Sequence, residues 1–142
     1  MNEIKATKYS DLHIGQFAEV THTITEEDIQ TFGDLSGDYN PLHFDEEWAK
    51  TTVFNGRIAH GLLTASFISA AIGMKLPGPG TIYLGQSMNF MGPVRIGDTI
   101  TARVEVAFLN DEKHRVTLKT LCTNQNQEVV IEGEAIIKIM SL

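Results

Sequence analysis

An aspartate and a histidine lie five positions apart in residues 37–47, which read GDYNPLHFDEE. Asp38 and His43 both transfer protons, and two such groups that share one water can activate it for addition to a neighbouring carbon. The Asn40-Pro41 pair between them favours a turn that would bring both side chains to one side. Gly, Asp, Asn and Pro are also typical of a plain polar loop. Because Pro41 pushes Asn40 toward extended dihedrals, we expect no helix here.

The charge and histidine patterns argue against two classes of site. The net charge is −7 and no run of Lys or Arg occurs, so the basic surface that nucleic-acid binding requires is missing. We also expect no metal site, because the histidines have no metal-ligand spacing. These residues are His13, His22, His43, His60 and His114.

The remaining composition, with 42% hydrophobic and 20% charged residues, is ordinary for a globular protein. At 142 residues, it is expected to form a single domain, residues 1–142. The lone cysteine, Cys122, excludes an internal disulfide and lies in an alternating stretch where packing is its expected role. The first 15 residues contain no apolar core, so we expect no signal peptide and a cytoplasmic location.

The first half of the chain predicts one strand and two short helices. Phe17 to Ile24 is expected to be a strand. Thr25 is a candidate N-cap for a helix over residues 26–35, whose first turn is acidic. Asp45 is expected to cap a second helix from Glu46 to Thr51.

The segment from Ile58 to Met74 contains no Asp, Glu, Lys or Arg in 17 residues. A helix that is apolar on all sides is either a membrane span or the buried centre of a domain. This segment is shorter than the ~20 residues that a bilayer requires, and polar residues interrupt it. We therefore predict a buried helix and no membrane association.

The pattern changes to period two after the breaker Pro77–Gly80. Apolar side chains alternate in four stretches, which end near Phe90, Phe108, Cys122 and Ile139. Turn residues separate the last three stretches, so we expect an antiparallel meander. One uncharged helix and about five antiparallel strands predict an α+β hotdog fold, in which the sheet wraps around the central helix.

Four motifs, spread between about Ile14 and Ile139, resemble the small (R)-specific enoyl-CoA hydratases of the MaoC-like group. The motifs are Asp38-Tyr39-Asn40-Pro41-Leu42-His43, Ala59-His60-Gly61-Leu62, Tyr83-Leu84-Gly85-Gln86-Ser87-Met88-Asn89-Phe90 and Pro93-Val94-Arg95-Ile96-Gly97-Asp98. Either of the first two alone would be weak, but the pair at this separation is fairly specific.

The resemblance implies reversible syn hydration of a trans-2-enoyl-CoA to an (R)-3-hydroxyacyl-CoA, without a cofactor. By the same resemblance, Asp38 and His43 form the catalytic dyad, and the backbone N–H of Gly61 binds the thioester oxygen. Which member of the dyad acts as acid or base stays open. A glycine at a helix N-terminus suits this role, because its N–H has no intrahelical acceptor and no Cβ obstructs the approach.

Three further residues are candidates for supporting roles. Asn40 is expected to hold the loop, and Ser69 either hydrogen-bonds near the dyad or bonds back to the helix. Ile72 lies eleven residues after Gly61, roughly 16 Å along a helix, and is either the floor of a short acyl pocket or a core residue. The resemblance also implies a homodimer that acts on an acyl-CoA or acyl-carrier-protein thioester. The scattered basic residues weakly favour coenzyme A.

Two alternatives remain open from the sequence. A thioesterase on the same scaffold would release free thiol rather than consume the conjugated double bond. A non-catalytic acyl-thioester sensor would have no reason to keep both Asp38 and His43. Acyl-chain length and the physiological direction of the reaction also stay undetermined.

Overall fold

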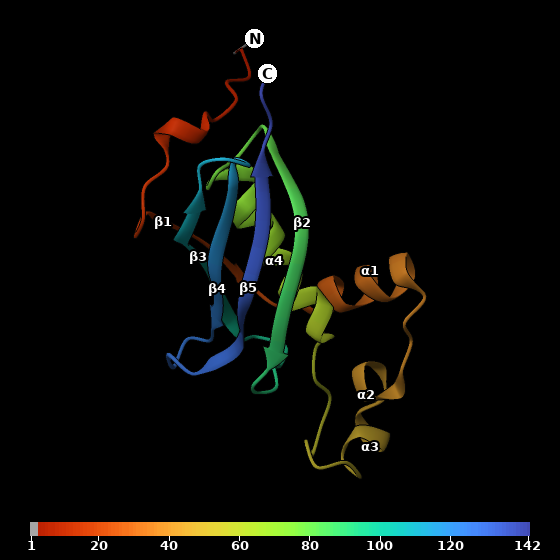
Figure 1. Cartoon of the computed structure of the whole chain (residues 1–142). Helices are drawn as coiled ribbons and strands as arrows, with labels where there is room; N and C mark the ends of the chain where they lie inside the picture. The colour runs from red at the N-terminus through yellow and green to blue at the C-terminus, as the bar shows by residue number, and fades with distance from the viewer. Residues whose placement is uncertain (1–2) are drawn as a thin grey trace.

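Five antiparallel strands form one sheet in the order β1-β3-β4-β5-β2, and a long helix, α4, packs along one face (Figure 1). The computed structural model describes residues 3–142. In chain order the elements are η1 (Tyr9–Asp11), β1 (Phe17–Thr23), α1 (Glu26–Ser36), α2 (Pro41–Phe44), α3 (Glu46–Ala49), α4 (Gly61–Met74), β2 (Thr81–Phe90), β3 (Thr99–Asn110), β4 (Arg115–Thr123) and β5 (Val129–Ile139). The predicted hotdog architecture is confirmed.

The core lies between the sheet and α4. Alternate residues of β3 and β4 are completely buried, among them Val104, Val106 and Leu118. This alternation follows from the pleat, which directs every second side chain toward the helix. Cys122 belongs to the same buried face, and burial raises the pKa of its thiol to about 12. The thiol is therefore a packing group, as its place in the alternating pattern predicted.

Helix α4 is buried on one side only, so the prediction of an all-round buried helix is wrong for the single chain. Ile68 and Ile72 face the sheet and are at most 2% exposed. On the opposite side, Leu62 is 59% and Met74 is 78% exposed. One sheet can cover only one face of a helix, and nothing within residues 3–142 covers the uncharged outer face. The helix also begins at Gly61 rather than Ile58.

Helices α1, α2 and α3 form a small lobe beside one end of the sheet (Figure 1). Thr25 caps α1 as predicted, in a reciprocal capping box with Asp28. The expectation of no helix around Pro41 is wrong, since α2 begins at that residue. Asn40 keeps the extended ψ of 127° that a following proline demands and serves as the N-cap, while Pro41 takes the first helical position. Helix α3 ends two residues before the predicted Thr51.

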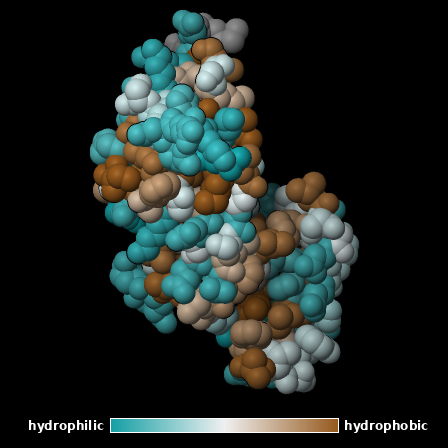
Figure 2. Space-filling view, in the orientation of Figure 1, coloured by the Kyte–Doolittle hydropathy of each residue, from teal (hydrophilic) through white to brown (hydrophobic). Residues whose placement is uncertain are grey.

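Strand β2 lies at an edge of the sheet and is largely exposed. A register shift falls between Tyr83 and Gly85, and both Leu84 and Phe90 are exposed. Figure 2 shows apolar surface where the lobe meets the body of the molecule. Within residues 3–142, no helix is both long and apolar enough to cross a bilayer.

Candidate active site

A cavity of about 470 Å³ lies where the helical lobe meets the N-terminus of α4. Asp38, His43, His60 and Gly61 all line it. Most of its other walls are apolar, as expected for a site that binds an acyl chain. These walls include Phe32, Phe54, Ile58, Leu62, Phe90, Met91, Pro93, Val94, Val130 and Ile131.

His43 is buried, and one hydrogen bond determines which ring nitrogen is free. Its Nδ1 lies 2.7 Å from the backbone oxygen of Ile58. A carbonyl oxygen can only accept, so Nδ1 carries the hydrogen and Nε2 of the neutral ring keeps its lone pair. Burial lowers the pKa of His43, although the hydrogen bond to Ile58 opposes this. The side chain therefore presents a neutral imidazole that can accept a proton at Nε2.

Asp38 reaches the cavity from the exposed loop between α1 and α2. Gly37 ends α1 in the left-handed conformation, with φ of 80°, and so turns the chain toward the cavity. Asp38 Oδ1 accepts a hydrogen bond from the backbone N–H of Asn40 at 3.2 Å. Asn40 Oδ1 in turn accepts from the N–H of Leu42 at 3.0 Å and so caps α2.

His60 also lines the cavity, and the sequence analysis did not single it out. Its side chain is 2% exposed, and its ring centroid lies 4.0 Å from that of His43. Its Nε2 donates to the backbone oxygen of Asp38 at 2.9 Å. The adjacency of His60 to Gly61 was visible in the sequence, but its contact with both dyad residues depends on the fold.

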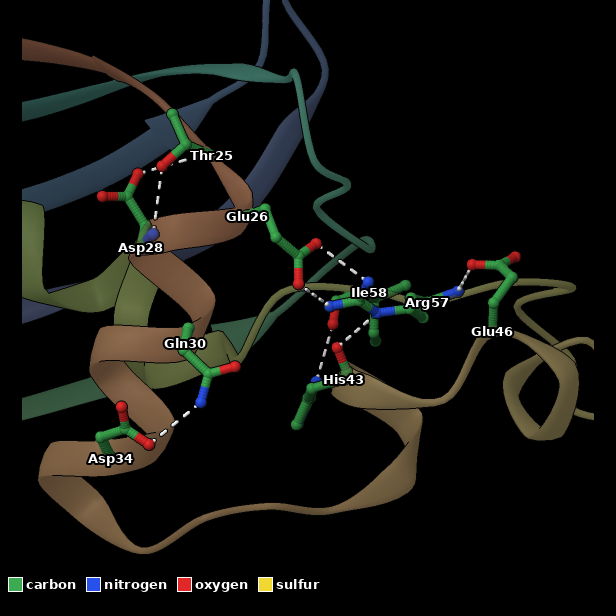
Figure 3. A network of polar contacts seen from close by, with 9 residues as sticks. All are labelled: Thr25, Glu26, Asp28, Gln30, Asp34, His43, Glu46, Arg57 and Ile58. Atoms are coloured by element: carbon green, nitrogen blue, oxygen red, sulfur yellow. Dashed lines mark hydrogen bonds and ion pairs between the residues drawn. The ribbon is translucent and has the colours of Figure 1, made fainter.

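Arg57 connects three segments around the site (Figure 3). Its Nε donates to the backbone oxygen of His43 at 2.7 Å, and its two terminal nitrogens each lie 2.9 Å from a carboxylate oxygen of Glu26. Its backbone N–H donates to Glu46 at 3.3 Å. The next residue is Ile58, whose carbonyl orients the His43 ring. This network therefore ties the start of α1 to two of the hydrogen bonds of His43, those to Arg57 and Ile58.

Gly61 is the first residue of α4, where backbone N–H groups have no intrahelical acceptor. A Cβ atom at this position would lie 2.5 Å from a ring carbon of Phe90. The glycine thus allows β2 to approach the helix N-terminus closely. Its N–H can donate to an oxygen placed in the cavity.

Comparisons with known proteins agree with this geometry. The MaoC-like domain family matches residues 14–129. The chain belongs to the MaoC-like family. It is 53% identical over 131 residues to the (R)-specific enoyl-CoA hydratase of Rhodospirillum rubrum, covering 92% of this chain and 90% of that protein.

Two other similar proteins belong to the same functional group. The 3-hydroxybutyryl-CoA dehydratase of Methylorubrum extorquens is 43% identical, covering 96% of this chain and 87% of that protein. The unliganded R-hydratase PhaJ1 of Pseudomonas aeruginosa superposes with a TM-score of 0.89 at 46% identity, covering 96% of this chain and 88% of that one. These matches make the MaoC-like chain a hydro-lyase.

The MaoC-like fold also brings together groups that could ligate a metal. One ligand atom from each of Asp38, His43 and His60 lies within 4.8 Å of the others. Histidine spacing in the sequence predicted no such cluster, since it depends on long-range contacts. Each ring already uses one nitrogen on a backbone carbonyl. The arrangement thus suits proton transfer, in which His43 needs its remaining nitrogen free.

The two other candidates from the sequence lie away from the MaoC-like cavity. Ser69 is exposed on the outer side of α4. Ile72 is 2% exposed and packs in the core cluster. Neither residue is among those that line the cavity in the described chain.

Proposed function

We propose that this protein is an (R)-specific enoyl-CoA hydratase that adds water reversibly to a trans-2-enoyl-CoA. One observation carries the proposal. Asp38 and His43 meet at a largely apolar cavity beside the N-terminus of α4, and His43 has Nε2 free to act as a base. The names of the similar hydratases and dehydratase support the same substrate class and the R configuration.

The first step uses His43 as the base. Its Nε2 takes a proton from a water molecule while the water oxygen bonds to Cβ of the substrate. The electrons of the double bond move toward the thioester, whose oxygen becomes negatively charged. The Asp38 carboxylate accepts a hydrogen bond from the water, orients it and faces the imidazolium that forms.

The second step completes the addition. The enolate takes a proton at Cα from the His43 imidazolium, and the neutral base is restored. Hydrogen and hydroxyl have then been added to the same face of the alkene, and dehydration is the reverse sequence. The N–H of Gly61, at the positive end of the helix dipole, stabilises the enolate oxygen. A donor of this kind typically contributes about 10²–10³ in rate.

Crotonyl-CoA hydration tests this proposal against its nearest alternative. A hydratase removes the absorbance of the conjugated enoyl thioester without releasing thiol, and its product is (R)-3-hydroxybutyryl-CoA. A thioesterase would release free coenzyme A at the same rate as it consumes substrate. Absence of both signals would instead favour an acyl-thioester sensor. Matched crotonyl-CoA and crotonyl-carrier-protein substrates would identify the preferred carrier.

The exposed outer face of α4 supports a homodimer as the working form. This face combines the large apolar side chains Leu62 and Met74 with small residues such as Ala70, and the exposed edge strand β2 adds Leu84 and Phe90. An uncharged surface of this kind is typical of an interface. An unpaired edge strand also favours association with a second chain.

A further inference from the structure

His60 contacts α1, α2 and the loop between them, the part of the lobe that carries the dyad. Its ring lies 4.7 Å from that of Phe32 in α1 and 4.0 Å from that of His43 in α2, measured between centroids. Its Nε2 donates to the backbone oxygen of Asp38 in the loop between them. One buried imidazole at the start of α4 therefore joins the helix N-terminus to both members of the dyad.

The hydrogen bond to Asp38 is the anchor of its loop. In the described chain, every other hydrogen bond of residues 37–40 stays within residues 33–43. Those local bonds shape the loop, but they cannot fix its distance from the cavity. The bond from His60 does so, because His60 belongs to the opposite wall.

We propose that His60 is a positioning residue that holds Asp38 and His43 at the separation the reaction requires. This inference rests on the proposed hydratase function. The ring acts in two ways: its N–H fixes the Asp38 backbone, and its face supports the buried face of the His43 ring. Misplacing a catalytic group by about 1 Å can lower the rate about 10²-fold.

The unpaired nitrogen of His60 makes phenylalanine an informative substitution. Nδ1 is buried and has no hydrogen-bond partner within residues 3–142. A carbon atom at that position loses no bond, so His60→Phe removes only the donor to Asp38 and keeps an aromatic ring beside His43. His60→Gln is the complementary variant, since its amide N–H can still reach the Asp38 oxygen but its ring is gone.

His22→Phe is a matched control outside the cavity. The His22 ring also combines one hydrogen bond, 2.7 Å to Asp28, with one aromatic neighbour, Phe67 at 4.7 Å. Any general cost of replacing such a histidine by phenylalanine should appear in this variant. We expect its kcat for crotonyl-CoA to stay within about twofold of the wild type.

The kinetic expectation for His60 is specific. His60→Phe should lower kcat about 10–100-fold with KM changed less than about threefold, and His60→Gln should recover at least half of that loss on a logarithmic scale. A His60→Phe enzyme with kcat within threefold of the wild type would overturn the proposal. Equal losses of kcat in His60→Phe and His60→Gln, in proportion to the fall in their melting temperatures, would also overturn it.

Nitrogen NMR of labelled histidines gives a readout that does not depend on turnover. The charged and titratable groups near His43 are Asp38 in the loop, His60 at α4 and Arg57 before it. In His60→Phe, loss of the hydrogen bond to Asp38 frees the loop, which should admit water to His43 and raise its measured pKa toward the ordinary value of about 6.5. An unchanged pKa and tautomer would overturn the positioning role. If the wild type hydrated no enoyl-CoA, the hydratase proposal would fail separately, and this measurement would still decide the role of His60.

Discussion

At the scale of single residues, one backbone carbonyl sets the chemistry of the site. The Ile58 oxygen holds Nδ1–H of His43, and burial of the ring lowers its pKa below the ordinary value of about 6.5. The carbonyl determines that Nε2 is the free nitrogen, and burial, which outweighs the opposing effect of that hydrogen bond on the pKa, keeps Nε2 unprotonated at neutral pH. A base with a lowered pKa stays active in more acidic solution than a free histidine would.

The rate and the stability should therefore depend on pH in the same direction. The value of kcat/KM for hydration should stay constant from pH 8 to below 6.5 and fall only in more acidic solution, where His43 protonates. In the window from about pH 6.5 down to the lower folded pKa, the unfolded chain binds more protons, so the free energy of unfolding decreases as pH falls. Rate and denaturation measurements at each pH test both. A fall in kcat/KM that begins above pH 6.5 would contradict the expectation.

The dyad residues themselves should act on turnover rather than on binding. Asp38→Asn and His43→Ala should each lower kcat about 10²–10⁴-fold with a modest change in KM. Circular dichroism would verify that each variant is folded. Near-normal turnover in folded Asp38→Asn would remove Asp38 from the mechanism.

At the scale of elements, Arg57 and His60 connect the lobe to the segment that leads into α4. Arg57 spans the gap between α1 and the His43 backbone with a geometry that only a guanidinium provides. The Glu26 side chain is more than half exposed, so the ion pair itself should contribute less than about 1 kcal/mol. The hydrogen bond from Arg57 Nε to the backbone oxygen of His43 should contribute more than the ion pair to the position of His43.

Arg57→Lys should therefore lower kcat about tenfold, because lysine cannot reach the carboxylate of Glu26 and the His43 oxygen together. Glu26→Gln should lower kcat less than about threefold. Arg103→Lys is the control, since Arg103 pairs with Glu19 and Glu105 on the sheet. Steady-state kinetics on the three variants would contradict this ranking if Glu26→Gln had the largest effect.

The sequence predicts local features of these elements well and long-range ones poorly. Thr25 and Asp28 predict the start of α1, because a capping box is formed within four consecutive residues. The same local view failed at Pro41, where a proline signal for extended backbone also marks the first residue of a helix. His60 could not be assigned a role, because the partners of its side chain are 16 or more residues away along the chain. Those partners meet it only in the folded lobe.

Ile72 lies too far along α4 to reach the cavity, so we expect it to affect stability and not substrate specificity. Its side chain lies in the core cluster and does not line the cavity. We expect Ile72→Ala to lower the free energy of unfolding by about 2–5 kcal/mol. The ratio of kcat/KM for octenoyl-CoA to that for crotonyl-CoA should stay unchanged. Denaturant titration and kinetics test this, and a shift of the ratio toward octenoyl-CoA would instead make Ile72 part of the acyl pocket.

At the scale of the whole molecule, the sheet covers only one side of the central helix, α4. The absence of charge in α4 predicted a helix buried on all sides, but the sequence could not show how much of that cover comes from the same chain. The sheet supplies one side. A second copy of the chain supplies the other in the proposed dimer.

We therefore expect a homodimer at micromolar concentration. Ala70→Glu places a charge in the middle of the outer face of α4 and should shift sedimentation toward the monomer. Thr31→Glu, on an exposed position of α1, is the control and should sediment like the wild type. A stable and active wild-type monomer would contradict the dimer.

The lobe also contains the single tryptophan of the chain, Trp48, in α3. Its ring is 46% exposed and stands in the same lobe as Asp38 and His43. Its fluorescence therefore reports on the lobe alone, whereas far-ultraviolet dichroism combines the signals of the lobe helices, the sheet and α4. If the lobe opens before the sheet melts, emission will change at lower denaturant than the dichroism. The protein thus carries an optical probe for local opening around the proposed catalytic residues, without any label.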